Sequence, residues 1–301
     1  MRWLGIGYRS LVSGSYRPGQ AVAFVGAVAC GKSLIAGIVA EAFGGRTAHP
    51  FKAWSEGNGF NGHLLGAETL LIDDETPSRD GRLRRNMASA IRSQLFSDTV
   101  EIHAKYAQPF TARPWWRLVI TCNNEPDAVA VLPPLDSTID DKIAFLAVTK
   151  PDFPDLSTDD ARSAFRRRLS AELPALLAEA VAMPITPFAK HNRTGIETHH
   201  NLDVLELLRE LTKEHHFELL LADAERDRVF TTPWQGTASE LQSILTAFES
   251  TVAARAKSLF GDWPSAVGVL LGELSRSKPD RVSQGERSAT ERQWIIHSVT
   301  G

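Results

Sequence analysis

Residues 21–44 read AVAFVGAVACGKSLIAGIVAEAFG, and this stretch decides the fold. Its first six residues form a short apolar run, which is typical of a strand that is buried on both faces. The loop GAVACGKS at 26–33 follows, and the apolar positions after it suit a helix that ends at Gly44 and Gly45. We therefore expect a strand, a loop and a helix in direct succession.

The loop has the form GxxxxGK[ST], which predicts a phosphate-binding site. Gly26 and Gly31 allow backbone N–H groups to curl around phosphates, while Lys32 reaches the β- and γ-phosphate oxygens and Ser33 ligates Mg²⁺. We expect Lys32 to face solvent when the loop is empty. The predicted nucleotide-binding residues are Gly26, Ala27, Val28, Ala29, Cys30, Gly31, Lys32, Ser33 and Leu34.

Acidic residues end a second apolar run, ETLLIDDE at 68–75. A strand that delivers acids at its carboxyl end can hold the magnesium shell with one carboxylate and polarise the attacking water with the next. We assign Asp74 to the metal and Glu75 to the water. Asp73 is an alternative metal ligand, because the pattern does not fix which of two adjacent acids faces the site.

Amide side chains end a third apolar run, WRLVITCNN at 116–124. An uncharged amide can hold both the γ-phosphate and the lytic water without competing for protons, so Asn123 and Asn124 are candidate catalytic residues. The alternative is an ordinary turn, in which Asn is a preferred residue.

The rest of the chain extends the α/β pattern and then leaves it. A basic helix, an alternating strand (TVEIHAKY) and a further strand (KIAFLAV) are expected before a Pro-rich joint, TKPDFPDLS, where helical periodicity takes over. Short apolar runs without polar alternation favour a central parallel sheet. We divide the chain into an α/β P-loop domain at 1–150, a helical region and linker at 151–227, and a small domain at 228–301.

The tail from Trp234 onward predicts two or three helices followed by a short β-hairpin, which is the pattern of a winged helix. Its apolar residues are expected to form a small core. Basic residues would then lie along a recognition face or wing. The predicted core residues are Trp234, Leu241, Leu245, Leu271, Leu274 and Trp294, and the basic residues are Arg276, Lys278, Arg281, Arg287 and Arg292.

The ordered set GAVACGKS, LLIDDE, VEIHAKY and LVITCNN resembles the Walker A, Walker B, B-prime and C motifs of superfamily 3 helicases, the AAA+-related motors of small DNA viruses, phages and plasmids. The resemblance covers residues 20–150. The segment FNGHLLGAETLLIDDE looks like the helicase portion of phage- and plasmid-type primase-helicases, and WQGTASELQSIL with SAVGVLLGELSRSKPDRV and ERQWII is similar to their winged-helix C-terminus.

This resemblance implies an ATP-dependent DNA helicase or translocase in phage, plasmid or mobile-element replication. ATP and Mg²⁺ would be its cofactors, single-stranded or forked DNA its partner, and a homo-oligomeric, hexameric ring its working form. Lys105 would belong to a hairpin that contacts single-stranded DNA in the central channel. The alternative reading of Lys105 is a solvated strand lysine.

Two features depart from the family's pattern. An arginine that reaches the neighbouring subunit's ATP usually follows motif C, whereas PLDSTIDDKIAFLAV offers only Lys142, a point charge without the planar fork of arginine. Arg113 and Arg117 are the next candidates for this role. The chain also begins shortly before the P-loop, so we expect a fragment, a split gene product or a minimal motor, with a separately encoded primase as a partner.

The amino-acid composition limits which partners and compartments these hypotheses allow. The chain has 301 residues, of which 43% are hydrophobic, and a formal net charge of −3, so nucleic-acid binding must come from local basic patches. No run of about 18 or more apolar residues occurs, which argues against a membrane span. The two cysteines lie within nucleotide-site motifs, so we expect a reducing, cytoplasmic compartment.

Alternative functions remain open at this point. They are a P-loop ATPase switch or loader, and a non-catalytic nucleotide-binding DNA-replication factor. A small-molecule kinase fits less well, because the acids of 73–75 and the terminal amides indicate water as the acceptor. The histidines His191, His199, His200, His215 and His216 are interpreted as part of a linker and helix, since open zinc sites usually include cysteine or closely spaced acids.

Overall fold

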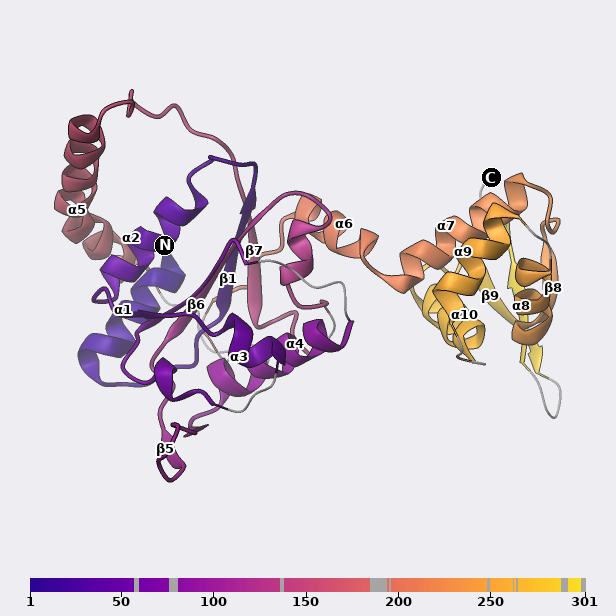
Figure 1. Ribbon diagram of the computed structural model, residues 1–301, viewed down its shortest axis with the longest axis horizontal. Coiled ribbons are helices and arrows are strands. Elements are labelled where there is room, and N and C mark those ends of the chain that lie inside the picture. The colour runs from indigo at the N-terminus through magenta and orange to yellow at the C-terminus, as the bar shows by residue number, and fades with distance from the viewer. Residues whose placement is uncertain are drawn as a thin grey trace. The chain divides into compact units, whose positions relative to one another are not determined.

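The computed structural model describes residues 1–56, 60–75, 81–135, 138–184, 194, 196–247, 250–261, 263, 265–287 and 292–298. The chain folds as two compact units, Met1–Leu208 and Arg209–Gly301 (Figure 1). In the described part of the chain, no helix is both long and apolar enough to cross a membrane.

The division differs from the three parts expected from the sequence. Helix α5 (Asp159–Ala182) packs against α1 (Arg2–Ser13), and a parallel bridge joins His200 to Phe145 of the sheet. The described residues of 151–208 therefore belong to the first unit. The N-terminal helix α1 was not expected from the sequence.

The first unit is built on a five-stranded parallel sheet of order β2-β3-β6-β1-β7. This confirms the expected mixed α/β fold with a central parallel sheet. Strands β1, β3 and β6 are apolar runs, and their inner positions are buried, as a sheet covered on both faces requires. The strands are β1 (Ala21–Gly26), β2 (Thr47–Ala48), β3 (Thr69–Asp73), β6 (Arg117–Asn123) and β7 (Ile143–Val148).

Helices cover the sheet. Residues of α1, α5 and α2 (Lys32–Ala42) share one apolar cluster with Val119 of β6, while α3 (Phe51–Glu56) packs on α4 (Gly81–Phe96). Figure 1 shows α1 and α2 on one side of the strands and α4 on the other. Two short 3₁₀ turns complete the unit, η1 (Gly62–Leu64) and η2 (Ala128–Val131).

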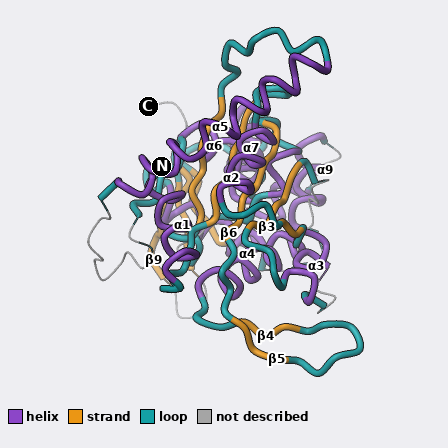
Figure 2. Tube along the Cα trace, turned by 90° about the vertical axis from the view of Figure 1, so that its left-hand side faces the viewer, coloured by secondary structure: helices purple, strands orange, loops and turns teal. Residues whose placement is uncertain are grey.

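A separate antiparallel hairpin consists of β4 (Val100–Ile102) and β5 (Phe110–Ala112). Its strand is shorter than TVEIHAKY, so Lys105 lies in the turn between the strands. Figure 2 shows this hairpin extending away from the sheet.

The second unit contains α7 (Lys213–Arg226), three helices and an antiparallel sheet of order β8-β10-β9. Two helices lie between residues 202 and 226, because Thr212 caps α7 by accepting a hydrogen bond from the His215 N–H. The remaining elements are α6 (Leu202–Glu210), β8 (Trp234–Thr237), α8 (Ala238–Thr246), α9 (Thr251–Phe260), α10 (Ala266–Ser277), β9 (Val282–Arg287) and β10 (Arg292–Ile296).

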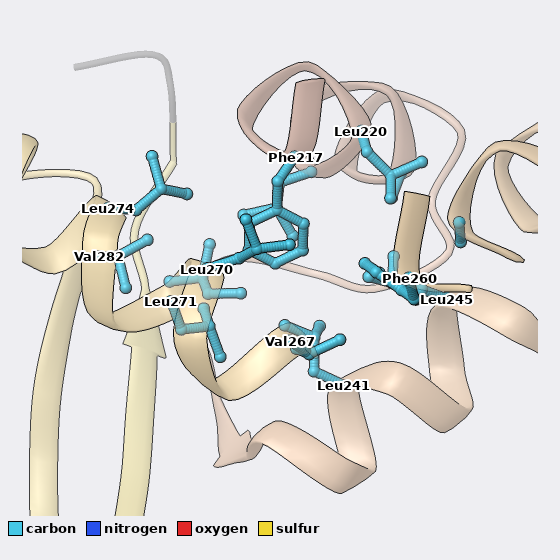
Figure 3. Close-up of a cluster of buried hydrophobic side chains, with 14 of the residues drawn as sticks. Phe217, Leu220, Leu241, Leu245, Phe260, Val267, Leu270, Leu271, Leu274 and Val282 are labelled. Carbon is cyan, nitrogen blue, oxygen red and sulfur yellow. The ribbon is translucent and has the colours of Figure 1, made fainter. Parts of the chain in front are cut away.

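The expected core of the tail is present. Leu241, Leu245, Leu271 and Leu274 are buried in one cluster with Phe217 of α7 (Figure 3). Trp294 is buried in the same cluster, and Trp234 packs against it partly buried. Helix α8 begins with a capping box in which Thr237 and Glu240 satisfy each other's backbone N–H groups.

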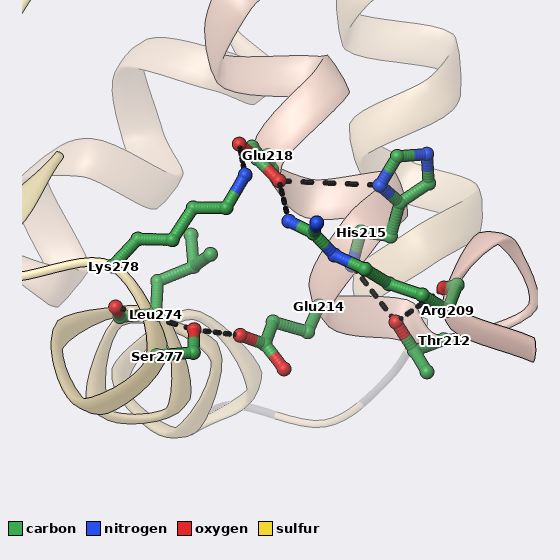
Figure 4. Close-up of polar contacts among 8 residues, drawn as sticks. All are labelled: Arg209, Thr212, Glu214, His215, Glu218, Leu274, Ser277 and Lys278. Carbon is green, nitrogen blue, oxygen red and sulfur yellow. Dashed lines mark hydrogen bonds and ion pairs between the residues drawn. The ribbon is translucent and has the colours of Figure 1, made fainter. Parts of the chain in front are cut away.

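Two of the basic residues expected on an exposed face are engaged within the unit. Arg281 is 7% exposed and donates to Glu225 Oε2 at 3.0 Å and to the His297 carbonyl. Lys278 pairs with Glu218, which also accepts from Arg209 at 3.1 Å (Figure 4). Arg276 and Arg292 are exposed, and the side chain of Arg287 lies outside the described residues.

Candidate nucleotide-binding site

The predicted phosphate loop connects β1 to α2. Ala29 and Gly31 both adopt positive φ, 58° and 97°, which folds the backbone into a tight curve before α2 begins at Lys32. Gly26 faces the end of β7, where an added Cβ would lie 2.3 Å from the Val148 carbonyl oxygen. Both glycines of the pattern are therefore required, one for backbone conformation and one for close approach.

Strand register brings the three polar strand ends to one edge of the sheet. Gly26 of β1 pairs with Asn123 of β6, and Asp73 of β3 pairs with Thr121 of β6. Because all of these strands are parallel, the loop, the acids and the amides meet at the same carboxyl edge.

Lys32 is buried in the loop, which corrects the expectation that it faces solvent. Its side chain is only 5% exposed. The ammonium donates to the Gly26 carbonyl at 3.0 Å, the Ala27 carbonyl at 2.8 Å and Asn123 Oδ1 at 2.9 Å. These three acceptors match the three protons of the ammonium, so a phosphate must replace one of them to bind this group.

The acids lie next to the first turn of α2. Ser33 Oγ donates to Asp73 Oδ1 at 2.9 Å, and the Thr121 hydroxyl donates to the same oxygen. Asp73 is thus the acid in direct contact with the predicted metal-ligating serine. Asp74 follows with φ 47° and lines the same pocket, while Glu75 is half-buried.

The two asparagines differ in position. Asn123 directs its side chain to Lys32, whereas Asn124 contacts the loop through its backbone N–H, which donates to the Gly26 carbonyl at 3.2 Å, and is otherwise exposed. Thr121, which was not expected, lies two residues before Asn123 and therefore on the same face of β6. The two-residue spacing between Thr121 and Asn123 is the sequence signal that could have indicated Thr121.

These groups border one pocket of about 220 Å³. The lining residues come from the loop, the start of α2, the end of β3 and the end of β6. They are Val28, Ala29, Gly31, Lys32, Ser33, Leu34, Asp74 and Asn123.

The two cysteines are free and buried. Burial raises the pKa of the Cys122 thiol to about 12, against a smaller opposing effect of Lys32. Cys122 is therefore neutral at ordinary pH and serves packing under the loop. Cys30 Sγ lies 3.9 Å from Lys32 Nζ.

The three candidates for a charge that acts between subunits, Lys142, Arg113 and Arg117, do not line this pocket. Lys142 precedes β7 at the amino edge of the sheet, pairs with Asp141 and lies over the Phe96 ring. Arg117 is 2% exposed and donates to the Arg17 carbonyl at 2.9 Å, and burial lowers its pKa to about 10. Arg117 is therefore a structural residue. Arg113 is exposed.

Lys105 is far from the pocket, in the exposed turn of the β4–β5 hairpin. Its ammonium lies 5.1 Å from the centroid of the Tyr106 ring, and Tyr106 is 94% exposed. Phe110 of β5 is also exposed. The hairpin, whose backbone extends away from the sheet in Figure 2, thus carries an exposed lysine and two exposed aromatic residues.

The histidines form no metal cluster: among the described residues, no group of three or more His, Cys, Asp or Glu side chains is arranged to hold a metal ion. His200 contacts the Ile143 carbonyl at 2.9 Å, and His215 lies 3.9 Å from Glu218. His191 lies outside the described residues.

Comparisons with known proteins agree with this fold. Residues 24–138, less than half of the chain, match a family of unknown function, DUF5906. The apo structure of the NrS-1 C-terminal region (305-718) matches with a TM-score of 0.56 and 11% identity, covering 98% of this chain and 71% of that chain. A second structure of that region, the A form, has a TM-score of 0.50, 10% identity and the same coverage.

A structure of JCV helicase with a bound small molecule matches with a TM-score of 0.38 and 13% identity, covering 75% of this chain and 65% of that chain. A search of curated protein sequences found no match. The chain therefore shares its fold with the NrS-1 C-terminal region, and the similarity extends over nearly its whole length.

The residues present fit a magnesium nucleotide. Ser33 and Asp73 already lie within hydrogen-bonding distance, and Asp74 supplies a second carboxylate. Magnesium prefers oxygen ligands and keeps several waters, so one hydroxyl and one or two carboxylates suffice. The positive-φ loop, the start of α2 and the Lys32 ammonium supply donors for phosphate oxygens.

Proposed function

We propose that the chain is an ATP-hydrolysing DNA motor, a helicase or translocase of the superfamily 3 type. The observation that carries this proposal is the pocket in which the P-loop, Asp74 and Asn123 meet at one edge of the parallel sheet, with Asp73 hydrogen-bonded to the pocket residue Ser33. The likeness of fold to the NrS-1 C-terminal region supports it.

The proposed roles of the residues in and beside the pocket are supported by their contacts. Lys32 is placed to neutralise charge on the β- and γ-phosphates after exchanging one of its loop contacts. Asp73 and Ser33 are the favoured magnesium ligands, with Asp74 beside them, and bound magnesium would offset phosphate charge. Asn123 is favoured over Asn124 as the amide that senses the γ-phosphate, because only its side chain reaches Lys32.

Glu75 is proposed to orient the attacking water. It follows the metal-binding acids by one residue, and the left-handed turn at Asp74 redirects the chain just before it. A carboxylate in this place can accept the water's proton as the new P–O bond forms.

Two surfaces are proposed to contact DNA. The β4–β5 hairpin presents Lys105 and Tyr106, a combination of cation and aromatic ring that suits single-stranded nucleic acid. In the second unit, helices α8, α9 and α10 are followed by the β9–β10 hairpin, which pairs with the earlier strand β8, and this succession of helices and hairpin supports a winged helix. Its exposed Arg276 and Arg292 are the basic groups proposed for phosphate contact.

Ring assembly remains part of the proposal. Arg113 is the strongest candidate for a charge acting between subunits, because it is an exposed guanidinium, whereas Lys142 is paired with Asp141. An arginine can also bind a phosphate in two parallel hydrogen bonds.

The test is ATP hydrolysis by the purified chain with and without single-stranded DNA. We expect magnesium-dependent turnover that DNA increases, loss of turnover in Lys32→Ala, and loss of most DNA stimulation in Lys105→Ala. Lys52→Ala, which changes another exposed lysine, serves as the matched control and should retain the stimulation. Tight ATP binding without hydrolysis would instead support a nucleotide-binding replication factor.

A further inference from the structure

An aromatic side chain lies directly on the phosphate loop. The chain leaves β7 at Val148, which abuts Gly26, and five residues later it reaches Phe153. A Cβ added at Gly31 would lie 3.0 Å from Phe153 Cζ and 3.7 Å from Cε2. The segment after β7 therefore crosses the loop, and Phe153 packs against the glycine that precedes Lys32.

The Phe153 ring is held in place from the other side. It meets Phe165 of α5 edge to face, with centroids 6.2 Å apart and planes at 89°. Arg162 of α5 donates to the Leu156 carbonyl at 2.9 Å, and Thr158 caps the helix by accepting from the Ala161 N–H. Phe153 nevertheless remains only partly buried, so part of the ring is open to a ligand.

The pocket next to it is too small for a whole nucleotide. Its volume of about 220 Å³ is below the usual range of about 300–1,000 Å³ for ligand sites, and none of its lining residues is aromatic. The phosphates occupy this space, so the ribose and base must extend beyond it. Next to β1, the sheet continues to β6 on one side, which carries Asn123, and to β7 on the other, which leads to Phe153.

We infer that Phe153 is the nucleobase platform of this site, with Phe165 as the residue that positions it. This inference rests on the proposed function, because it requires a nucleoside triphosphate on the loop. A base stacks on an aromatic ring through its π face, which every base has, so Phe153 increases affinity for the nucleoside part without reading base identity through hydrogen bonds.

The experiment compares two ligands that share the phosphate chain. We measure binding of ATP and of inorganic tripolyphosphate, both with Mg²⁺, to the full chain and to Phe153→Ala. We expect the ATP affinity to fall about tenfold or more, while the tripolyphosphate affinity stays within about twofold. Phe153→Trp should restore ATP binding, and Trp263→Ala, which removes an exposed aromatic residue of the second unit, should change neither.

The outcomes are separable. An equal loss for both ligands would assign Phe153 to loop structure and overturn the inference, as would an unchanged ATP affinity. If the unmodified chain binds ATP no more tightly than tripolyphosphate, the inference fails, but the phosphate-binding site is supported. If it binds neither ligand, the proposed function itself fails and the inference with it.

Discussion

Replacing Gly31 with alanine tests the loop geometry, and Gly37→Ala is its matched control. Gly31 has φ 97°, a left-handed conformation that costs an L-residue about 1–2 kcal/mol. The new methyl group would also lie 3.0 Å from Phe153 Cζ. Reduced freedom of the unfolded chain offsets about 0.4–1 kcal/mol of this cost.

Gly37, in contrast, lies in a helix with open space around its Cα. It lies within α2, and a Cβ added there meets nothing within 4 Å. Alanine is preferred over glycine in a helix interior by about 0.5–1 kcal/mol. We therefore expect Gly31→Ala to destabilise the first unit by up to about 1.5 kcal/mol, to which the contact with Phe153 adds, and Gly37→Ala to stabilise it by about 0.5–1 kcal/mol.

The assay is native-state hydrogen exchange of the amides of β1 and β6, read by mass spectrometry, because it reports on the first unit alone. Measurements without nucleotide isolate folding from binding. Stability changes of the same sign and size in the two variants would refute the loop geometry described here. A stabilised Gly31→Ala variant would refute it most strongly.

Three further predictions address other parts of the chain. Glu75→Gln should still bind ATP but turn it over about 10²–10⁴-fold more slowly in a steady-state assay; unimpaired turnover would move the role of the base elsewhere. Because burial raises the pKa of Cys122 to about 12, folding stability should fall as pH rises from about 9 to 12, by up to about 4 kcal/mol. Urea titrations across this range should show a shallower decline in Cys122→Ala, and identical slopes would contradict the assignment. Arg281→Met should destabilise the second unit by about 2–4 kcal/mol, because it removes the guanidinium that pairs with Glu225. Arg276→Ala should lower DNA affinity with little change in the unfolding midpoint. Weaker DNA binding in Arg281→Met and lower stability in Arg276→Ala would exchange the two roles.

The sequence predicted the central sheet and its polar edge because each strand is a short apolar run that ends abruptly in functional groups. GAVACGKS, LLIDDE and LVITCNN each carry that signal, and parallel pairing then brings their ends together. The structure refines the choice among neighbours. Asp73 contacts Ser33, and Asn123 contacts Lys32, which local pattern could not decide because adjacent residues of a strand differ only in the face they occupy.

Tertiary contacts explain what the sequence did not predict. Helix α1 contains Gly5 and Gly7, which lower its intrinsic helix propensity, and it packs on α5 because Gly5 allows a close approach: an added Cβ would lie 2.0 Å from the Ala180 carbonyl oxygen. The burial of Lys32 depends on carbonyl groups that only the folded loop presents. Phe153 lies in a Pro-rich joint without periodicity, so nothing in its surroundings indicated that it would reach the loop.

The most direct test of the central claim is separation of a forked DNA duplex by the full chain in the presence of ATP and Mg²⁺. We predict strand release that requires hydrolysis, and that is therefore absent with a non-hydrolysable ATP analogue and in Lys32→Ala. Hydrolysis of ATP and binding of the forked DNA without any strand release would contradict a helicase and would leave a translocase or a P-loop switch.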